Sequence, residues 1–83
     1  MWYCYILKSL KDNKRYIGST NDPSRRLVEH NSGKVHSTKN RKPFVLIYRE
    51  EFETETEARK REHYFKTHKG YNELEKLLNP PPY

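Results

Sequence analysis

The sequence has little of what disulfides, metal centres and membrane spans require. It holds a single cysteine, Cys4, among 83 residues, which excludes a disulfide within the chain and a cysteine-based zinc site. No apolar segment approaches the roughly 20 residues of a membrane-spanning helix, and the N-terminus lacks the apolar core of a signal peptide. We therefore expect a cytoplasmic protein with no membrane partner.

Several common catalytic and binding motifs are also missing. The sequence contains no GxGxxG or GxxxxGK(S/T) loop, which excludes the usual nucleotide sites, and no CxxC or HExxH pair, which argues against a closed zinc site. Asp and Glu are not clustered outside the acidic run of residues 50–57, which argues against a nuclease that binds two metal ions. We expect no small-molecule cofactor.

The chain is short and poor in apolar residues. With 83 residues, of which 33% are hydrophobic, it has room for one small core, and we expect a single domain over residues 1–79. Seven tyrosines contribute to an aromatic share of 13%, and each aromatic ring buries a large area while few torsions become fixed. The proline-rich end, residues 80–83, is expected to be a loose tail.

Positive charge is concentrated in the first half of the chain. Residues 1–42 hold ten Lys and Arg against three Asp and Glu, whereas residues 43–83 hold seven against eight. A positive field confined to one half indicates a polyanion as the partner. The alternative is an ordinary solubilising surface.

Three segments have the composition of β-strands. Residues 2–9 and 44–49 are apolar at alternating positions of both parities, which is typical of strands covered on both faces. Residues 16–18 form a second, shorter strand. Asp12 and Asn13 tolerate turn conformations, so the first two strands are expected to pair as a hairpin.

A helix start follows the hairpin. Asp22 can cap the helix and Pro23 suits its first position, while Gly33 marks its end. The apolar residues that we expect to face the core are Leu27 and Val28. Arg26 and His30 are four residues apart, so they should project together from the flank of this helix.

Two further helices follow the third strand. Thr54 and Glu57 have the spacing of a capping box, and a basic run ending at Gly70 fits the end of this helix. A last short helix carries three leucines at helical spacing, Leu74, Leu77 and Leu78. The elements predict an α/β fold, with a small, mainly antiparallel three-stranded sheet flanked by about three helices in the order ββαβαα.

Glu62 occupies an unusual place for a carboxylate. Ala58 and Phe65 define the inward face of the second helix, and Glu62 lies about 40° around the helix from Ala58. A carboxylate beside a buried stripe is costly unless a cation or a metal ion meets it. Glu62 is therefore a candidate site residue.

The polar residues that remain fit phosphodiester hydrolysis. This reaction needs an activated water, stabilisation of charge at phosphorus, and protonation or metal binding of the leaving oxygen. An arginine binds phosphate through its bidentate fork, and one glutamate can hold a Mg²⁺ ion that keeps several waters. The candidates are Tyr5, Tyr16, Arg26, His30 and Glu62. Taken one by one, such residues are more often ordinary strand aromatics, solvated arginines or surface histidines.

The two strands of the hairpin resemble a known family signature. Residues 3–5 (YCY) and residues 16–18 (YIG) are similar to the paired strands of the GIY-YIG nuclease superfamily. The resemblance extends to Arg26, His30 and Glu62, and it is greatest to small stand-alone members related to the N-terminal nuclease domain of UvrC. The first segment has tyrosine and cysteine where the family has glycine and isoleucine.

This resemblance implies a metal-dependent endonuclease that hydrolyses DNA phosphodiester bonds. Tyr5 or Tyr16 would help to deprotonate the attacking water, while the other would orient the water or the phosphate. Arg26 would bind the scissile phosphate, and His30 would assist proton transfer or contact the phosphate. Glu62 would hold one divalent metal ion, Mg²⁺ or alternatively Mn²⁺.

The resemblance also suggests how DNA is bound. Such families often use a late asparagine, for which the one candidate is Asn79. Flanking phosphates would be neutralised by basic residues in and after the first helix, Arg25, Lys34, Lys39, Arg41 and Lys42. Because no recognition helix is evident, we expect a monomer with low sequence specificity that acts on branched, nicked or single-stranded DNA in repair or recombination.

Two other functions fit the same sequence. A non-catalytic nucleic-acid-binding module would keep the fold and the basic face without cutting, and a structural partner domain would dock through the leucines of the last helix. The catalytic interpretation requires both phenols on one face of the sheet. A two-residue turn at residues 12–13 would place Ser9 opposite Tyr16 and leave Tyr5 four residues away, so a strong twist, a bulge or another register must close the gap.

Overall fold

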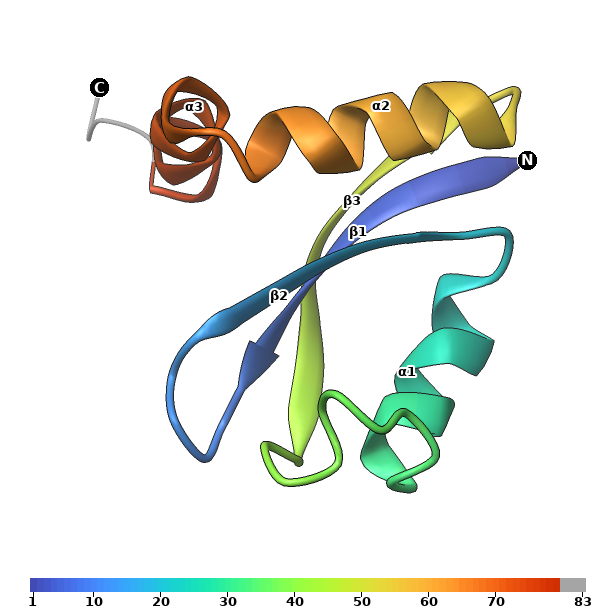
Figure 1. Ribbon diagram of the computed structural model, residues 1–83, viewed down its shortest axis with the longest axis vertical. Coiled ribbons are helices and arrows are strands. Elements are labelled where there is room, and N and C mark those ends of the chain that lie inside the picture. Colours follow the sequence, from blue (N-terminus) through green and yellow to red (C-terminus); the bar gives the residue numbers. More distant parts are fainter. Residues whose placement is uncertain (80–83) are drawn as a thin grey trace.

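A three-stranded antiparallel sheet forms the centre of the molecule, whose computed structural model describes residues 1–79 (Figure 1). The strands are β1 (Trp2–Ser9), β2 (Arg15–Thr20) and β3 (Phe44–Phe52), and the helices are α1 (Pro23–Asn31), α2 (Glu55–Phe65) and α3 (His68–Leu78). The strand order is β2-β1-β3, so β1 is central. The predicted α/β fold and its element order are confirmed. The predicted tail, residues 80–83, lies outside the described residues.

The sheet is covered on both faces, as the composition of β1 predicted. Since side chains alternate along a strand, Tyr5 and Leu7 pack with Phe44 on the face that α1 covers. Cys4 and Ile6 lie on the other face, where they pack against core residues of α2 and α3. Figure 1 shows α1 and α2 on opposite sides of the sheet. None of the helices within residues 1–79 has the length and apolar character needed to cross a bilayer.

The turn between β1 and β2 is longer than predicted, and this changes the register. Leu7 pairs with Tyr16 and Tyr5 pairs with Gly18, so the expected pairing of Ser9 with Tyr16 is wrong. Backbone N–H groups of residues 11 and 12 both donate to the Ser9 hydroxyl, which stabilises a loop over residues 10–13. The shift leaves Tyr5 two residues from the partner of Tyr16 instead of four.

Strand β3 is longer than predicted, and the face that it buries changes along its length. Phe44 and Leu46 pack with the cluster of Tyr5 and Leu7, whereas Tyr48 and Phe52 pack against the cluster on the opposite face of the sheet. Val45 and Ile47 are exposed, which corrects the expectation that both faces are buried along the whole strand. A β-bulge shifts the pairing with β1 between Ile6 and Leu7. Beyond the predicted end the strand stays paired with β1 through Phe52, and Arg61 of α2 binds the Glu50 carboxylate at 2.8 Å from the guanidinium Nε.

Helix α1 begins as predicted but turns a different face to the core. The Asp22 carboxylate accepts from the Arg25 backbone N–H at 3.1 Å, which confirms the cap. Val28 is 67% exposed, so the prediction that it is buried is wrong. His30 is fully buried and Leu27 half-buried, because the inward face follows their three-residue spacing.

The predicted end of α2 at Gly70 is wrong. The Thr54 cap is confirmed, since its hydroxyl accepts from the Glu57 backbone N–H, but α2 ends at Phe65 and Thr67 caps α3. A Cβ atom on Gly70 would lie 1.7 Å from the carbonyl oxygen of Tyr64. Gly70 therefore allows α3 to pack closely against the end of α2. It lies within α3 and does not end a helix.

The inward faces of α2 and α3 follow their apolar spacing. Ala58 and Phe65 are both buried, as predicted. Leu74 is buried and Leu78 packs beside it, whereas Leu77 is largely exposed. The last helix thus covers one face of the sheet with two of its three leucines.

Candidate active site

Tyr5 and Tyr16 lie on the same face of the sheet. Their ring centroids are 6.2 Å apart, and Tyr5 is buried while Tyr16 is half-buried. Gly18, opposite Tyr5 on β2, leaves room for the Tyr5 ring. The longer hairpin loop is what brings the two phenols together.

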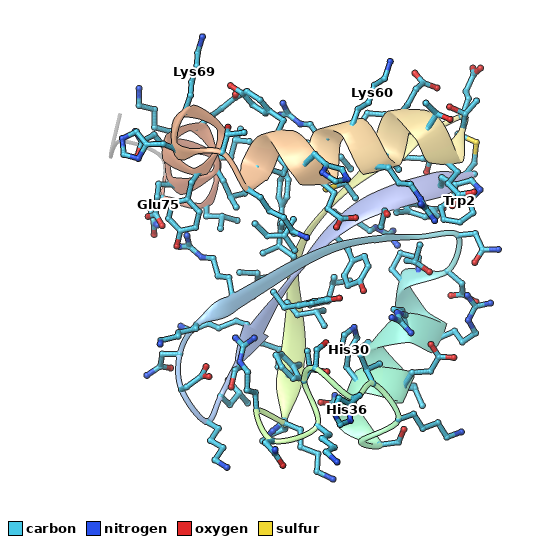
Figure 2. All side chains as sticks on the ribbon, viewed as in Figure 1. Trp2, His30, His36, Lys60, Lys69 and Glu75 are labelled. Carbon is cyan, nitrogen blue, oxygen red and sulfur yellow. The ribbon has the colours of Figure 1, made fainter. Side chains whose placement is uncertain are left out.

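His30 reaches the two phenols from α1. Its Nε2 lies 3.1 Å from the Tyr5 hydroxyl, and its ring centroid lies 4.8 Å from that of Tyr16. The ring also packs against Phe44 of β3, at 5.7 Å between centroids. A lone histidine is usually a surface residue, but His30 is fully buried and points from α1 toward the sheet (Figure 2). This side chain joins α1 to the phenol face of the sheet.

Thr38 determines which nitrogen of His30 carries the proton. The Thr38 hydroxyl lies 2.7 Å from His30 Nδ1, and it donates to the carbonyl oxygen of Val35 at 3.4 Å. Because a hydroxyl has one proton to donate, we assign the proton of the neutral imidazole to Nδ1, which donates to Thr38. Nε2 is then free to accept the proton of Tyr5. Thr38 is itself buried, in the loop that follows α1.

Burial keeps both groups uncharged at neutral pH. Burial raises the pKa of Tyr5 to about 12, although the nearby Arg26 guanidinium opposes the shift. Burial lowers the pKa of His30 to about 4, and the positive charge of Arg26 adds to that shift. In the free protein a neutral phenol therefore donates to a neutral imidazole.

Arg26 is held at the edge of this cluster. Its guanidinium lies 3.0 Å from the carboxylate of Glu29, one turn further along α1. The side chain is about one-third exposed, so solvent reaches it. Its positive charge opposes the rise in the pKa of Tyr5 and adds to the fall in the pKa of His30, although burial is the larger cause of both shifts. An arginine in this position can bind an incoming phosphate with its fork.

Glu62 lies on α2 beside the edge strand β2. One carboxylate oxygen accepts from the Ser19 hydroxyl at 2.8 Å, and the other lies 2.8 Å from the Lys66 ammonium. The predicted cation partner is thus present as Lys66. Glu62 comes from the opposite side of the sheet to the phenols. Its partner Lys66 and the phenol Tyr16 line one depression at the edge strand β2.

Glu62 offers a single carboxylate to a metal ion. Within residues 1–79, no group of three or more His, Cys, Asp and Glu side chains is placed to hold a metal. A zinc site is therefore not built here. A single carboxylate suits Mg²⁺, which usually keeps several waters and takes substrate oxygens as its remaining ligands.

Asn79 does not join the phenols. It is exposed at the end of α3, where its amide nitrogen lies 3.5 Å from the carboxylate of Glu75. It lines a groove between α3 and the β1–β2 hairpin, together with Lys14 and Arg15. The suggested role of a late asparagine finds no partner in this geometry.

Four of the five predicted DNA-binding residues are exposed to solvent. Arg25, Lys34, Lys39 and Lys42 are exposed. Arg41 instead binds the Asp12 carboxylate at 2.9 Å, and its guanidinium stacks over the ring of Phe44. Arg41 therefore fastens the loop to the hairpin, and it is less exposed than the other four.

The hairpin adds basic residues that sequence reasoning missed. Lys11 donates to the carbonyl oxygen of Asn40 at 3.0 Å, which joins the hairpin loop to residues 33–42. Lys14 is exposed in the same hairpin. We call these two loops, residues 8–15 and 33–42, the basic end of the molecule. The run of lysine and arginine around Asp12 was the signal that could have indicated it.

Comparison with known proteins gives concordant matches. A family model described as the GIY-YIG catalytic domain matches residues 1–75. A UPF0213 protein of Staphylococcus haemolyticus is 41% identical over 90% of this chain and 92% of its own, and the UPF0213 protein YazA of Bacillus subtilis is 46% identical over 77% and 65%. The solution NMR structure of a UPF0213 protein from Bacillus halodurans matches with a TM-score of 0.55 and 35% identity, over 98% of this chain and 89% of that one.

Proposed function

The chain belongs to the GIY-YIG catalytic domain family, a family of nucleases, and we propose that it is a metal-dependent endonuclease that hydrolyses DNA phosphodiester bonds. One observation carries this proposal: the Tyr5 hydroxyl lies 3.1 Å from Nε2 of His30, whose Nδ1 lies 2.7 Å from the Thr38 hydroxyl. A buried phenol joined to a proton acceptor is a path along which a water molecule can lose its proton.

The proposed proton path runs through Tyr5. A water molecule that enters beside Tyr16 and reaches the Tyr5 oxygen would give its proton to the phenol while the phenol proton moves to Nε2 of His30. The resulting hydroxide attacks phosphorus, and Thr38 accepts from the protonated imidazole throughout. Tyr16 is the phenol that solvent reaches, so its role is to orient the attacking water.

A bound phosphate makes this transfer less costly. In the free protein the positive charge of Arg26 opposes protonation of His30. When Arg26 binds the scissile phosphate, the phosphate compensates that charge, and the imidazolium becomes easier to form. Arg26 then has two roles. It binds the substrate, and its charge affects how readily His30 takes up a proton.

Glu62 is the residue that would hold the metal ion, with Ser19 orienting its carboxylate. A bound Mg²⁺ supplies charge neutralisation at the leaving oxygen. Lys66 would give up its contact with Glu62 or shift to a phosphate oxygen. The exposed position of Lys66 makes either change inexpensive.

The proposed substrate is DNA, which the protein would cut with low sequence specificity. Branched, nicked or single-stranded DNA is favoured. The basic end offers exposed lysines for phosphate contacts, and these contacts carry no base information. We propose that the protein acts as a cytoplasmic monomer in DNA repair or recombination.

The test is cleavage of supercoiled and branched DNA in Mg²⁺ or in EDTA. Wild type should nick DNA in Mg²⁺ only, whereas Glu62→Ala and Tyr5→Phe should each lose at least 100-fold in rate. Lys60→Ala is the matched control, because Lys60 is exposed on the outer side of α2 and points away from the site (Figure 2). Equal nicking by all four proteins would contradict the proposal.

A non-catalytic DNA-binding module is the second candidate. It is favoured by the pairing of Arg26 with Glu29 and of Glu62 with Lys66, which leaves both charged groups satisfied without a substrate. Salt-dependent DNA binding by wild type, with no cleavage in Mg²⁺ or Mn²⁺ on any of these substrates, would establish it.

A further inference from the structure

A groove lies between α3 and the β1–β2 hairpin, away from the face that carries Tyr5. It has a volume of about 770 Å³. Its floor is apolar and includes Ile17 and Leu78, and its rim is charged. Figure 2 shows Glu75 on the side of α3 toward the hairpin, while Lys69 points away.

The charges around the groove favour an anion. Arg15 forms an ion pair with Glu75, so these two side chains largely cancel. Lys8 and Lys14 also line the groove, and within residues 1–79 neither takes part in an ion pair. Their positive charge belongs to the basic end, so the groove continues the surface to which DNA is expected to bind.

An exposed aromatic ring stands in the same groove. Tyr71 of α3 is 43% exposed, and the Arg15 guanidinium lies 5.7 Å from its ring centroid. The Tyr71 hydroxyl accepts from Arg15 at 3.4 Å, which orients the ring. An exposed aromatic ring beside cations is the arrangement on which single-stranded bases stack.

A second depression connects this groove with the candidate active site through shared lining. It is lined by Tyr16 and Lys66, and by Arg15, Ile17 and Tyr71, which also line the groove. Tyr16 belongs to the phenol pair, and Lys66 contacts Glu62. The path passes over the edge strand β2, where no further strand of the sheet within residues 1–79 covers it.

We propose that the groove binds a single-stranded arm of the DNA substrate as it leaves the active site over β2. A base stacks on Tyr71, and Lys8 and Lys14 contact the phosphates of the arm. This inference rests on the proposed function, because it takes the site at Tyr16 as the point from which the arm leaves.

Binding is measured by fluorescence anisotropy in EDTA, with a blunt duplex and with the same duplex carrying a single-stranded arm. Tyr71→Ala should weaken binding of the armed duplex roughly 5- to 100-fold and leave the blunt duplex unchanged. Tyr71→Phe keeps the ring and should retain most of the affinity. Lys14→Ala should lower the salt dependence by about one phosphate contact. Lys60→Ala is the control for charge removal.

Three outcomes overturn the inference: equal affinity of wild type for both duplexes, equal weakening of both by Tyr71→Ala, or no effect of Tyr71→Ala. Clear preference for an RNA arm would assign the groove to RNA, and a dimer that Tyr71→Ala dissociates would assign it to a second copy of the chain. Absence of cleavage together with arm-specific binding would contradict the proposed nuclease activity alone.

Discussion

The Tyr5 ring fills the space that a side chain on Gly18 would need. A Cβ atom at position 18 would lie 2.7 Å from the Tyr5 hydroxyl oxygen and 2.8 Å from the ring carbon that bears it. Both residues are buried, so the ring has little room to move aside. The glycine of the second signature segment is thus required by the phenol of the first.

Gly18→Ala should therefore displace the Tyr5 hydroxyl from His30. We expect a loss of about 1–3 kcal/mol in the free energy of unfolding, and a fall in cleavage rate of roughly 100-fold. Chemical denaturation and a nicking assay measure the two effects. In a Tyr5→Leu background the same substitution should cost much less stability, and an equal cost in both backgrounds would contradict the steric explanation.

Ser19 and Lys66 should affect metal affinity in opposite directions. Ser19→Ala removes the hydroxyl that orients Glu62, so the Mg²⁺ concentration for half-maximal cleavage should rise about tenfold. Lys66→Gln removes a competing charge and should lower that concentration a few-fold. Calorimetric titration with Mn²⁺ gives a second measurement that needs no catalysis. Shifts of equal sign would place the metal ion elsewhere.

Thr38 should control the tautomer of His30. Thr38→Val has nearly the same shape but leaves the proton on Nδ1 without an acceptor, at a cost of about 1–3 kcal/mol in folding stability. We expect the cleavage rate to fall at least tenfold, and Thr38→Ser to restore it. The ¹⁵N chemical shifts of the His30 ring report the tautomer directly, and an unchanged tautomer in Thr38→Val would refute the assignment.

Folding stability should fall on acidification because of His30. The pKa of His30 in the folded state is about 4, below the ordinary histidine value of 6.5, because the ring is buried and Arg26 repels its charged form. The unfolded chain therefore takes up this proton first, even though Glu29 partly favours the charged ring. The stabilisation is complete above about pH 6.5, and about 3 kcal/mol is lost as the pH falls to about 4.

Urea denaturation between pH 4 and pH 8 measures this loss. His30→Gln should remove the part of the pH dependence that belongs to this histidine. His36→Ala, in an exposed position on the following loop, should leave it unchanged. A wild-type profile that matches His30→Gln throughout would show that the histidine is not buried in its neutral form.

Gly70→Ala should be among the most destabilising substitutions in the chain. The added methyl group would collide with the backbone carbonyl of Tyr64, which cannot rotate away as a side chain could. We expect a loss of about 3 kcal/mol or more in the free energy of unfolding, measured by chemical denaturation. Gly33→Ala provides a comparison, because its cost comes from a φ of 80° and not from a collision.

The most accurate predictions concern features that depend on residues close together in the sequence. Asp22 and Thr54 cap their helices because each bonds to a backbone N–H three residues ahead. The two-sided apolar pattern of β1 likewise made it the central strand. Such signals are contained in short windows of sequence.

The errors arose where the packing between elements, or a side-chain contact with the backbone, decides the structure. Gly70 follows a basic run, as a glycine at a helix end does. A glycine is needed there, however, because the backbone of Tyr64 in the preceding helix lies too close for a side chain. The hairpin loop is longer than two residues because the Ser9 side chain binds the loop backbone. Val28 is apolar yet exposed, because the inward face of α1 is set by His30.

The sequence indicated which main residues belong to the candidate site, but not the hydrogen bonds that hold them. The family signature indicated Tyr5, Tyr16 and His30, and the structure shows them in contact. Nothing in the sequence indicated Thr38, because a single threonine eight residues after a histidine forms no pattern. Ser19 was equally hidden, since its partner Glu62 lies 43 residues further along the chain.

The loop of residues 33–42 carries the exposed Lys34 and Lys39 and also Thr38, whose hydroxyl lies 2.7 Å from the buried imidazole. One segment of backbone therefore joins two parts of the proposed function, the contact with phosphates and the support of the proton acceptor. Under that function, a movement of this loop on binding DNA would also move Thr38 and change the support of His30. Substrates too short to contact both lysines would then be cut more slowly than longer ones.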